Sequence, residues 1–262
     1  MTEFEQEVSA RLEAVPGNTA LQAAAAGFLK ESIAARYSYN FFWLGRPIIQ
    51  YPQDIAAMQE LVWQVRPGVI VETGIAHGGS LVLSASLLAL LDLCDATEAG
   101  EMLDPAKPKR RVVGVDIDIR QHNRTAIEAH PLANRITMIQ GSSIDEAIVA
   151  QVRAAVGDAK RVLVCLDSNH THDHVLAELK AYAPMVTPGS YCIVFDTVVE
   201  DLPKELSFDR PWGPGANPKT AVHAWLAGQS DFEIDRSWDA KLIVSVAPDG
   251  FLRRRQDAQS AE

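Results

Sequence analysis

The sequence predicts an α/β fold of the Rossmann-like type, in which helices cover a doubly wound, mostly parallel sheet. Short apolar segments alternate with helical segments along the chain, and this alternation is typical of an open parallel sheet. The segments are apolar on both faces, as in Val162–Leu166, which is expected of strands buried between two helical layers. A glycine turn separates the first strand from its helix, as in folds that bind a nucleoside.

The elements are expected in a regular order. Residues 1–36 carry helical patterning, and Asp54 is expected to be the N-cap of a helix that Pro67 ends. Strands are expected at 68–73, 111–116, 134–139, 161–166 and 190–195, and helices are expected to begin near Gly79, Arg120, Ile144, Thr171 and Lys219. Residues 232–235 and 241–246 are expected to form an antiparallel pair that closes one edge of the sheet.

Two segments interrupt the alternation. Residues 92–110 resemble a surface insertion between the first helix and the second strand. Residues 197–217 are rich in proline and glycine and follow the fifth strand at its carboxyl end, where open α/β sheets bind ligands, so they are expected to form a lid or substrate loop. We therefore expect a helical extension at 1–55 that covers cofactor and substrate, a catalytic domain at 56–250, and a polar tail at 251–262.

Composition narrows the class of protein. The 262 residues carry a formal net charge of −10, which argues against a nucleic-acid partner. The three cysteines have no metal-type spacing and fit a reducing cytoplasm. The chain lacks the roughly 18 uninterrupted apolar residues that a membrane span needs, and its acidic start is unlike a signal peptide. A cytoplasmic protein without a membrane partner is expected.

The glycine turn indicates the kind of nucleoside cofactor. It reads Glu72-Thr-Gly-Ile-Ala-His-Gly-Gly-Ser80 and lacks the three glycines with which dinucleotide enzymes accommodate a pyrophosphate. An acid at Glu72 would repel a pyrophosphate, but it suits a cationic cofactor without phosphates. S-adenosylmethionine is such a cofactor, and we expect Glu72 and Gly74 near its methionine part.

Two further positions bear on the same cofactor. Asp116 ends the second strand and is expected to accept hydrogen bonds from the ribose hydroxyls. Ser143 follows the third strand and could lie near the adenine. It could equally cap the next helix, and the sequence leaves both interpretations open.

Acidic and imidazole side chains follow the fourth and fifth strands. Asp167 and Asp196 are expected at adjacent strand ends, where two carboxylates could hold Mg²⁺ or could each cap a turn. His170 is expected to face the cleft and to take a proton from a substrate hydroxyl. His172 and His174 are expected to be partly exposed residues of the helix that follows.

At these residues the chain resembles the cephalosporin hydroxylase family, over roughly residues 37–255. The resemblance rests on these positions: Trp43-Leu-Gly45, Pro47, Gln50, Pro52, Asp54, Arg66-Pro67, Glu72-Thr-Gly74, Gly78-Gly-Ser80, Asp167-Ser168, His170, His174-Val175, Pro188-Gly189, Asp196-Thr197 and Arg210-Pro-Trp-Gly-Pro-Gly-Ala-Asn-Pro-Lys219. Despite its name, that family has the fold of S-adenosylmethionine-dependent methyltransferases. It includes sugar and natural-product O-methyltransferases that are commonly oligomeric and Mg²⁺-dependent.

The resemblance implies further site residues. Gln50 would close over the methionine end of the cofactor. A more distant similarity to catechol O-methyltransferase implies that Ser80 belongs to the cofactor site, that Asp167, Asp196 and Thr197 hold the metal, and that His170 is the base. The chain departs from both patterns, because it has Phe195-Asp196 where family members commonly have Glu-Asp and Thr197 where the catechol enzymes have Asn. One expected metal ligand is therefore missing.

The sequence thus predicts an O-methyltransferase, Mg²⁺-assisted and homo-oligomeric, that acts on a hydroxyl of a small molecule such as a sugar or a phenol. One alternative is a cofactor-binding subunit that supports a partner enzyme without catalysing a reaction. Another is a hydroxylase component with a non-haem iron held by His170, His172 and Asp167, although neighbouring positions at a helix start give poor facial geometry.

Overall fold

A seven-stranded sheet in the order β5-β4-β3-β6-β7-β9-β8 forms the centre of the computed structural model, which describes residues 1–207 and 209–256. Five strands are parallel: β3 (Val69–Thr73), β4 (Arg111–Asp116), β5 (Ile136–Gln140), β6 (Val162–Leu166) and β7 (Tyr191–Val194). β8 (Phe232–Ile234) and β9 (Phe251–Arg254) add an antiparallel edge. The predicted α/β fold and its five parallel strands are confirmed.

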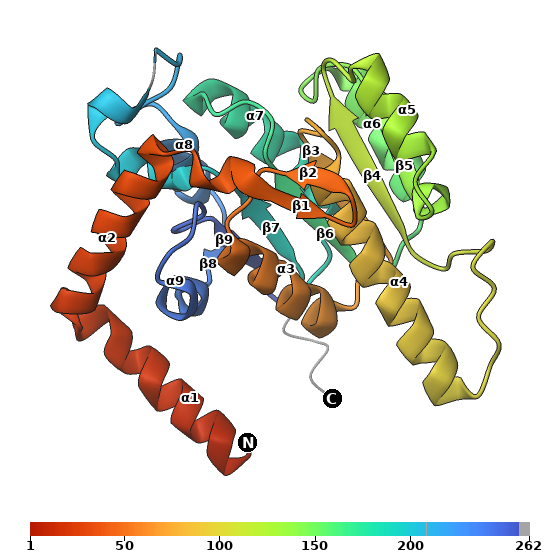
Figure 1. The fold of residues 1–262 in the computed structure, drawn as a ribbon, viewed down its shortest axis with the longest axis horizontal. Helices are drawn as coiled ribbons and strands as arrows, with labels where there is room; N and C mark the ends of the chain where they lie inside the picture. Colours follow the sequence, from red (N-terminus) through yellow and green to blue (C-terminus); the bar gives the residue numbers. More distant parts are fainter. Residues whose placement is uncertain (208, 257–262) are drawn as a thin grey trace.

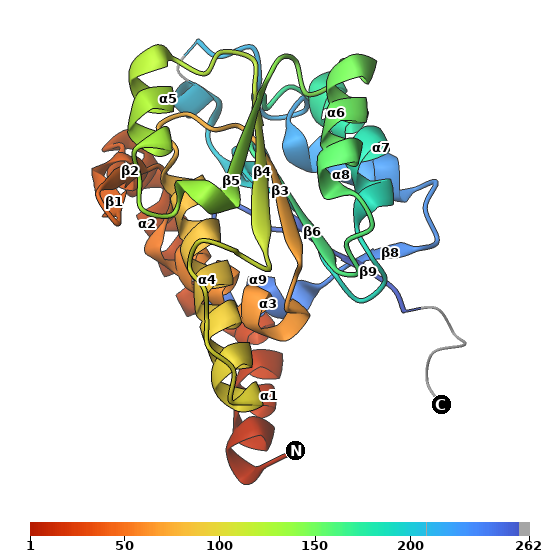
Figure 2. The same ribbon diagram turned by 90° about the vertical axis from the view of Figure 1, so that its right-hand side faces the viewer.

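Two hydrophobic cores lie on opposite faces of this sheet (Figures 1 and 2). One face carries α3 (Pro52–Val65), α4 (Gly79–Ala99), α5 (Gln121–Glu128) and α9 (Arg236–Leu242); the other carries α6 (Glu146–Val156), α7 (His172–Tyr182) and α8 (Pro218–Leu226). Successive residues of a strand point to opposite faces, so Ile70 packs into the first core while Val69 and Val71 pack into the second. This sandwich explains why the strands are apolar on both faces.

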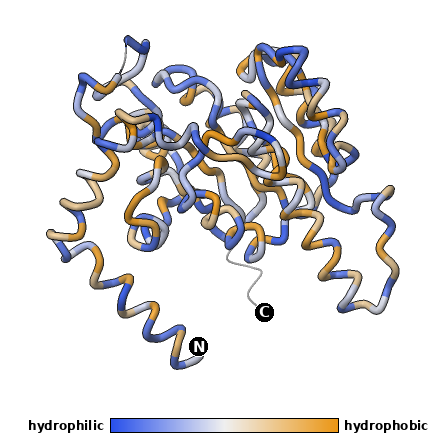
Figure 3. Tube along the Cα trace, in the orientation of Figure 1, coloured by the Kyte–Doolittle hydropathy of each residue, from blue (hydrophilic) through white to orange (hydrophobic). Residues whose placement is uncertain are grey.

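The first core contains the most apolar helix of the chain. α4 has 21 residues and is long and apolar enough to cross a membrane. However, 67% of its most apolar 18-residue stretch is buried within the protein. Figure 3 shows its apolar positions running alongside the sheet. The helix is therefore explained as a core element.

An N-terminal extension precedes the sheet. α1 (Glu3–Ala14) has no buried residue and projects away from the body, and α2 (Thr19–Ala34) leads back toward the sheet (Figure 1). A hairpin of β1 (Phe41–Trp43) and β2 (Arg46–Ile48) then packs on α4, where the Trp43 indole donates to Ser86 Oγ at 3.0 Å. The hairpin brings residues 46–51 over the start of α4.

The predicted strand at 241–246 is wrong. Asp235 accepts a hydrogen bond from the Ser237 backbone and caps α9, and the Trp238 ring stacks on Phe251 with centroids 5.4 Å apart. The alternating pattern of 241–246 is typical of a strand, but this tertiary packing overrides it. The edge strand is β9, so residues 251–254 belong to the sheet and not to a polar tail. Residues 257–262 of that predicted tail lie outside the described residues.

Two other boundaries differ from the prediction. α3 begins at Pro52 with Tyr51 as N-cap, and Asp54 lies inside its first turn. The Asp54 carboxylate is buried and accepts hydrogen bonds from Ser245 Oγ at 2.6 Å and Val246 N at 3.1 Å. The expected insertion at 92–110 is partly helical, because α4 continues to Ala99.

Candidate active site

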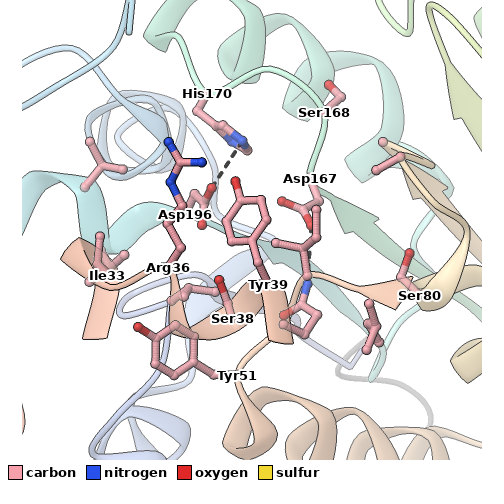
Figure 4. Close-up of a pocket in the computed structure, with 18 of the residues that line it drawn as sticks. Ile33, Arg36, Ser38, Tyr39, Tyr51, Ser80, Asp167, Ser168, His170 and Asp196 are labelled. Carbon is pink, nitrogen blue, oxygen red and sulfur yellow. Dashed lines mark hydrogen bonds and ion pairs between the residues drawn. The ribbon is translucent and has the colours of Figure 1, made fainter. Parts of the chain in front are cut away.

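A cavity of about 500 Å³ opens at the carboxyl ends of β3, β6 and β7 (Figure 4). Its walls come from the glycine turn after β3, the turns after β6 and β7, the N-terminal extension and the 197–217 segment. The residues used below that line it are Arg36, Tyr39, Gln50, Gly74, Ile75, Ala76, Ser80, Asp167, Ser168, His170, Asp196, Arg210 and Trp212. The predicted position of the site, at the carboxyl edge of the sheet, agrees with this cavity.

The glycine turn draws three strand ends together. Gly74 has φ +90°, and a Cβ at this position would lie 2.1 Å from the Asp167 carbonyl oxygen, so no other residue fits there. The Asp116 carboxylate accepts hydrogen bonds from Ile75 N at 2.8 Å and Ala76 N at 3.1 Å. Asp116 does not line the cavity, but it holds the glycine turn, which does line it. Its remaining acceptor capacity keeps the ribose assignment open as a proposal.

Hydrogen-bond acceptors gather in a smaller recess next to the turn. Gln50, Glu72, Ser80 and Asp167 all line it. Glu72 accepts from Ser84 and Ser80, and burial raises the pKa of its carboxyl above the usual range. Gln50 Nε2 donates to Asp167 Oδ2 at 3.3 Å, while Gln50 Oε1 is buried without a partner among the described residues. A buried acceptor without a donor is costly, so the recess is suited to a cationic, hydrogen-donating group.

Asp167 also belongs to a compact cluster with His170 and Asp196, next to this recess. One ligand atom from each residue lies within 4.8 Å of the others, and His170 Nε2 is 3.1 Å from Asp196 Oδ2. Burial, followed by the charge of Asp196, raises the pKa of Asp167 well above its usual range. A divalent cation would relieve this crowding of negative charge, and oxygen and nitrogen ligands of this kind suit it.

Thr197 does not belong to this cluster. Its side chain is fully buried, and its hydroxyl donates to the Pro248 carbonyl oxygen at 2.6 Å. The prediction of Thr197 as a metal ligand is therefore wrong, because β7 ends in a turn that directs this residue into the protein interior. The third group beside the two carboxylates is the imidazole of His170.

Ser143 also lies apart from the cavity lining. It is buried, its hydroxyl is 3.0 Å from His174 Nε2, and its carbonyl oxygen accepts from the Tyr182 hydroxyl at 2.8 Å. The structure therefore gives Ser143 a structural partner in α7 and does not support its place beside adenine. Asp145, two residues later, caps α6 by accepting from Ala147 N.

The other two histidines of this segment, His172 and His174, have structural partners. His174 lies 3.3 Å from Ser168 Oγ, which itself donates to the buried Glu178. His172 Nδ1 is 2.8 Å from Thr220 Oγ1 and ties α7 to α8. A facial iron site would need His172 to turn toward Asp167, so this partner argues against the hydroxylase alternative.

Sequence reasoning missed the residues that shape the outer part of the cavity. Arg36 and Tyr39 reach it from the N-terminal extension, and Arg210 and Trp212 reach it from the 197–217 segment. The Trp212 ring meets His170 edge-on, with centroids 4.9 Å apart, and Arg210 lies over the same indole at 5.4 Å. The sequence Arg210-Pro-Trp212 marks a loop at a strand's carboxyl end, but it does not tell which of its side chains faces the cavity, and Arg36 and Tyr39 have no local signal.

Comparisons with known proteins agree with the geometry of the site. Residues 35–255 match the family model described as Rhamnosyl O-methyltransferase/CmcI. A rhamnosyl O-methyltransferase from Mycobacterium tuberculosis is 26% identical over 206 residues, which cover 77% of this chain and 73% of that protein. The Mycobacterium leprae protein of the same name is 26% identical over 215 residues, covering 81% and 82% of the two chains.

A solved structure has the same fold. A structure of CmcI with S-adenosylhomocysteine superposes with a TM-score of 0.54 at 20% identity, covering 82% of each chain. A CmcI structure with Mg and S-adenosylmethionine gives a TM-score of 0.53 at 19% identity, covering 82% of this chain and 77% of that one.

Proposed function

Because the chain belongs to the Rhamnosyl O-methyltransferase/CmcI family, we propose that this S-adenosylmethionine-dependent O-methyltransferase acts on a hydroxyl of a sugar. The observation that carries the proposal is the pairing of two adjoining half-sites that share Asp167. Acceptors that suit a cationic cofactor line the recess, and the cluster of Asp167, His170 and Asp196 lines the cavity next to it.

The residues of the recess fit S-adenosylmethionine. Its ammonium group would find acceptors in Glu72 and in the partnerless Gln50 Oε1, and the ribose would approach Asp116 across the glycine turn. Ser80 holds Glu72 from the first turn of α4. When bound, the cofactor supplies a sulfonium methyl that is already activated for transfer. The chain's own contribution is therefore alignment of the acceptor with that methyl group.

The cluster fits a divalent metal ion such as Mg²⁺. Asp167 and Asp196 would hold it, with the His170 imidazole as the third nearby group. When bound, the ion supplies positive charge that stabilises an ionised acceptor hydroxyl. Gln50 contacts Asp167, so one side chain links the recess to the cluster.

His170 is placed to act as the general base. Its ring is oriented by the Asp196 carboxylate on one nitrogen and by the edge of Trp212. A carboxylate paired with an imidazole holds the ring in position and stabilises the positive charge that the ring acquires with a proton. The acceptor hydroxyl would lose its proton to this imidazole as it attacks the methyl group.

Loss of the metal or of its ligands tests the proposal. We expect wild-type protein to bind S-adenosylhomocysteine in calorimetry and to methylate rhamnosides in the presence of Mg²⁺. EDTA and the variant Asp196→Asn are each expected to lower turnover by at least about a hundredfold while the affinity for S-adenosylhomocysteine stays within about threefold. Asp201→Asn is the matched control, because Asp201 is exposed and pairs with Lys219.

The outcomes separate the candidate functions. Undiminished turnover in EDTA and in Asp196→Asn would remove the metal from the account. Cofactor binding without turnover on any hydroxylated acceptor would instead favour the non-catalytic supporting subunit.

We also propose a cytoplasmic location and a homo-oligomeric state. Cys94, Cys165 and Cys192 are free thiols, which supports a reducing cytoplasm. A homo-oligomer and the absence of nucleic-acid and membrane partners stay predictions. Size-exclusion chromatography with light scattering measures the first of these directly.

A further inference from the structure

We infer that the acceptor sugar carries an anionic group, a phosphate or a carboxylate, which Arg36 and Arg210 bind in the cavity. The inference rests on the proposed function, since it concerns the substrate of that same site. Both side chains line the cavity, and they reach it from opposite ends of the chain. Both residues are exposed, so an anion can reach them from solvent.

Neither guanidinium has an anionic partner of its own. Asp196 pairs with His170 and Asp167 accepts from Gln50, and within the described residues neither arginine forms an ion pair or a side-chain hydrogen bond. Most other arginines of the chain do have such partners; Arg110 and Arg135, for example, share Asp92. Two charged groups that line one cavity without a counter-ion are expected to bind one from solution.

The backbone presents Arg36 to the cavity. It follows α2 with φ +54°, a conformation that residues other than glycine adopt uncommonly. Figure 4 shows its side chain pointing into the cavity, toward the end that holds His170 and Asp196. A strained residue that directs a cation into a ligand cavity is typical of a binding position.

Arg210 is held at a defined place relative to the reacting groups. Its guanidinium lies over the Trp212 ring, and the edge of that ring contacts His170. Stacking leaves the planar face of the guanidinium occupied and its N–H groups free to donate in the plane. An anion bound to those N–H groups would thus be separated from His170 by the Trp212 ring.

The charges of the loaded site favour the same conclusion. Asp167 and Asp196 would be neutralised by a divalent ion, and Glu72 would balance the net positive charge of the cofactor. Arg36 and Arg210 would then be uncompensated in a cavity with partly apolar walls. A neutral sugar would leave this excess positive charge in place, whereas an anionic sugar relieves it.

The experiment measures binding and not turnover. Full-length protein saturated with S-adenosylhomocysteine and Mg²⁺ is titrated by calorimetry with rhamnosyl phosphate, galacturonate and methyl rhamnoside. At least one anionic probe is expected to bind about tenfold or more tightly than methyl rhamnoside. Arg36→Gln and Arg210→Gln are each expected to weaken that probe about tenfold or more and to leave methyl rhamnoside unchanged. The better anionic probe identifies the group as a phosphate or a carboxylate.

Arg253→Gln is the matched control. Arg253 pairs in register with Tyr191, at the end of β7 away from the cavity, and this variant is expected to bind all three probes as wild type does. Equal binding of anionic and neutral probes, or anionic binding that survives both cavity variants, would overturn the inference. The affinity for S-adenosylhomocysteine is measured first in wild type and in every variant. If wild-type protein does not bind S-adenosylhomocysteine, the proposed function is contradicted and not this inference.

Discussion

Asp116 shows how one carboxylate can serve both the fold and the ligand. Its Oδ2 accepts from two consecutive backbone amides of the glycine turn, and its Oδ1 accepts from Asp118 N at 3.0 Å. The chain needs an acid here to hold the turn even before any nucleoside binds. The same carboxylate keeps acceptor capacity to spare, and this capacity supports the proposal that it also binds the ribose.

Removal of this carboxylate is expected to weaken cofactor binding strongly. Asp116→Ala loses the proposed ribose contact and the two amide contacts of the turn. We expect the Kd of S-adenosylhomocysteine in calorimetry to rise at least about a hundredfold, at roughly 1.5–3 kcal/mol for each hydrogen bond to a charged group. Asp118→Ala is the control, because the Asp118 side chain is exposed and only its amide contacts Asp116. An unchanged Kd in Asp116→Ala would refute the ribose assignment.

Some site residues are positioned by a neighbouring strand, and others are positioned by the conformation of a long loop. Glu72, Asp167 and Asp196 could be predicted because each lies at or just beyond the carboxyl end of a buried strand, and these strand ends meet at one edge of a parallel sheet. Arg36, Arg210 and Trp212 could not, because their positions depend on loop conformations that no local pattern sets. Thr197 was predicted wrongly for the same reason: the turn after β7 decides whether its hydroxyl faces the cavity or Pro248.

The 197–217 segment forms part of the wall of the cavity. Its far end is held by Asn217, whose Oδ1 accepts from Lys219 N at 2.9 Å and whose Nδ2 donates to the Gly213 carbonyl oxygen at 2.9 Å and to Glu200. Glu200 also accepts from Gly215 N. One buried amide thus caps α8 and closes the loop on itself. The sequence indicated a loop here, but its internal bonding depends on these contacts across 17 residues.

Removal of this cap is expected to loosen the loop. Asn217→Ala leaves buried donors and acceptors unpaired, so we expect a loss of about 2 kcal/mol in the free energy of unfolding. Hydrogen exchange of the amides in 200–216 is expected to become faster. Asp145→Ala is the matched control, because Asp145 caps α6 in the same way at a different place. Equal exchange in both variants would mean that Asn217 does not hold the loop.

At the scale of the whole molecule, Asp54 links the first helix of the α/β core to a segment near the chain's end. Its carboxylate bonds Ser245 and Val246, 191 and 192 residues away. Burial raises the pKa of Asp54 to about 7, although both hydrogen bonds act in the opposite direction. The sequence predicted the α/β architecture and the alternation of helices and strands. It could not predict this bridge, because an aspartate two residues after Pro52 fits the pattern of an N-cap as well as that of a first-turn residue.

The bridge makes the stability of the fold depend on pH. The folded protein keeps the Asp54 proton up to about pH 7, whereas the unfolded chain releases it near the ordinary value of 3.8. The folded state therefore binds more protons across this window, so its stability falls as the pH rises. Urea unfolding at pH 5 and pH 8 is expected to show a larger loss in wild type than in Asp54→Asn, by up to about 2.5 kcal/mol.

Other carboxyls with raised pKa values, such as Glu72 and Asp239, contribute equally in both proteins. The difference between the two slopes therefore belongs to Asp54. Asp104→Asn is the control, because Asp104 is exposed and should leave the slope unchanged. Parallel slopes in wild type and Asp54→Asn would show that the carboxyl is not protonated in the folded state.

Transfer of a labelled methyl group to a sugar would demonstrate the proposed activity itself. S-adenosylmethionine with an isotopically labelled methyl group is incubated with the protein, Mg²⁺ and an anionic rhamnose derivative, and the products are followed by mass spectrometry. The account predicts one labelled methyl ether on the sugar and one equivalent of S-adenosylhomocysteine, with both lost in EDTA and restored by added Mg²⁺. Label that stays on S-adenosylmethionine with every hydroxylated sugar, while the cofactor remains bound, would contradict it.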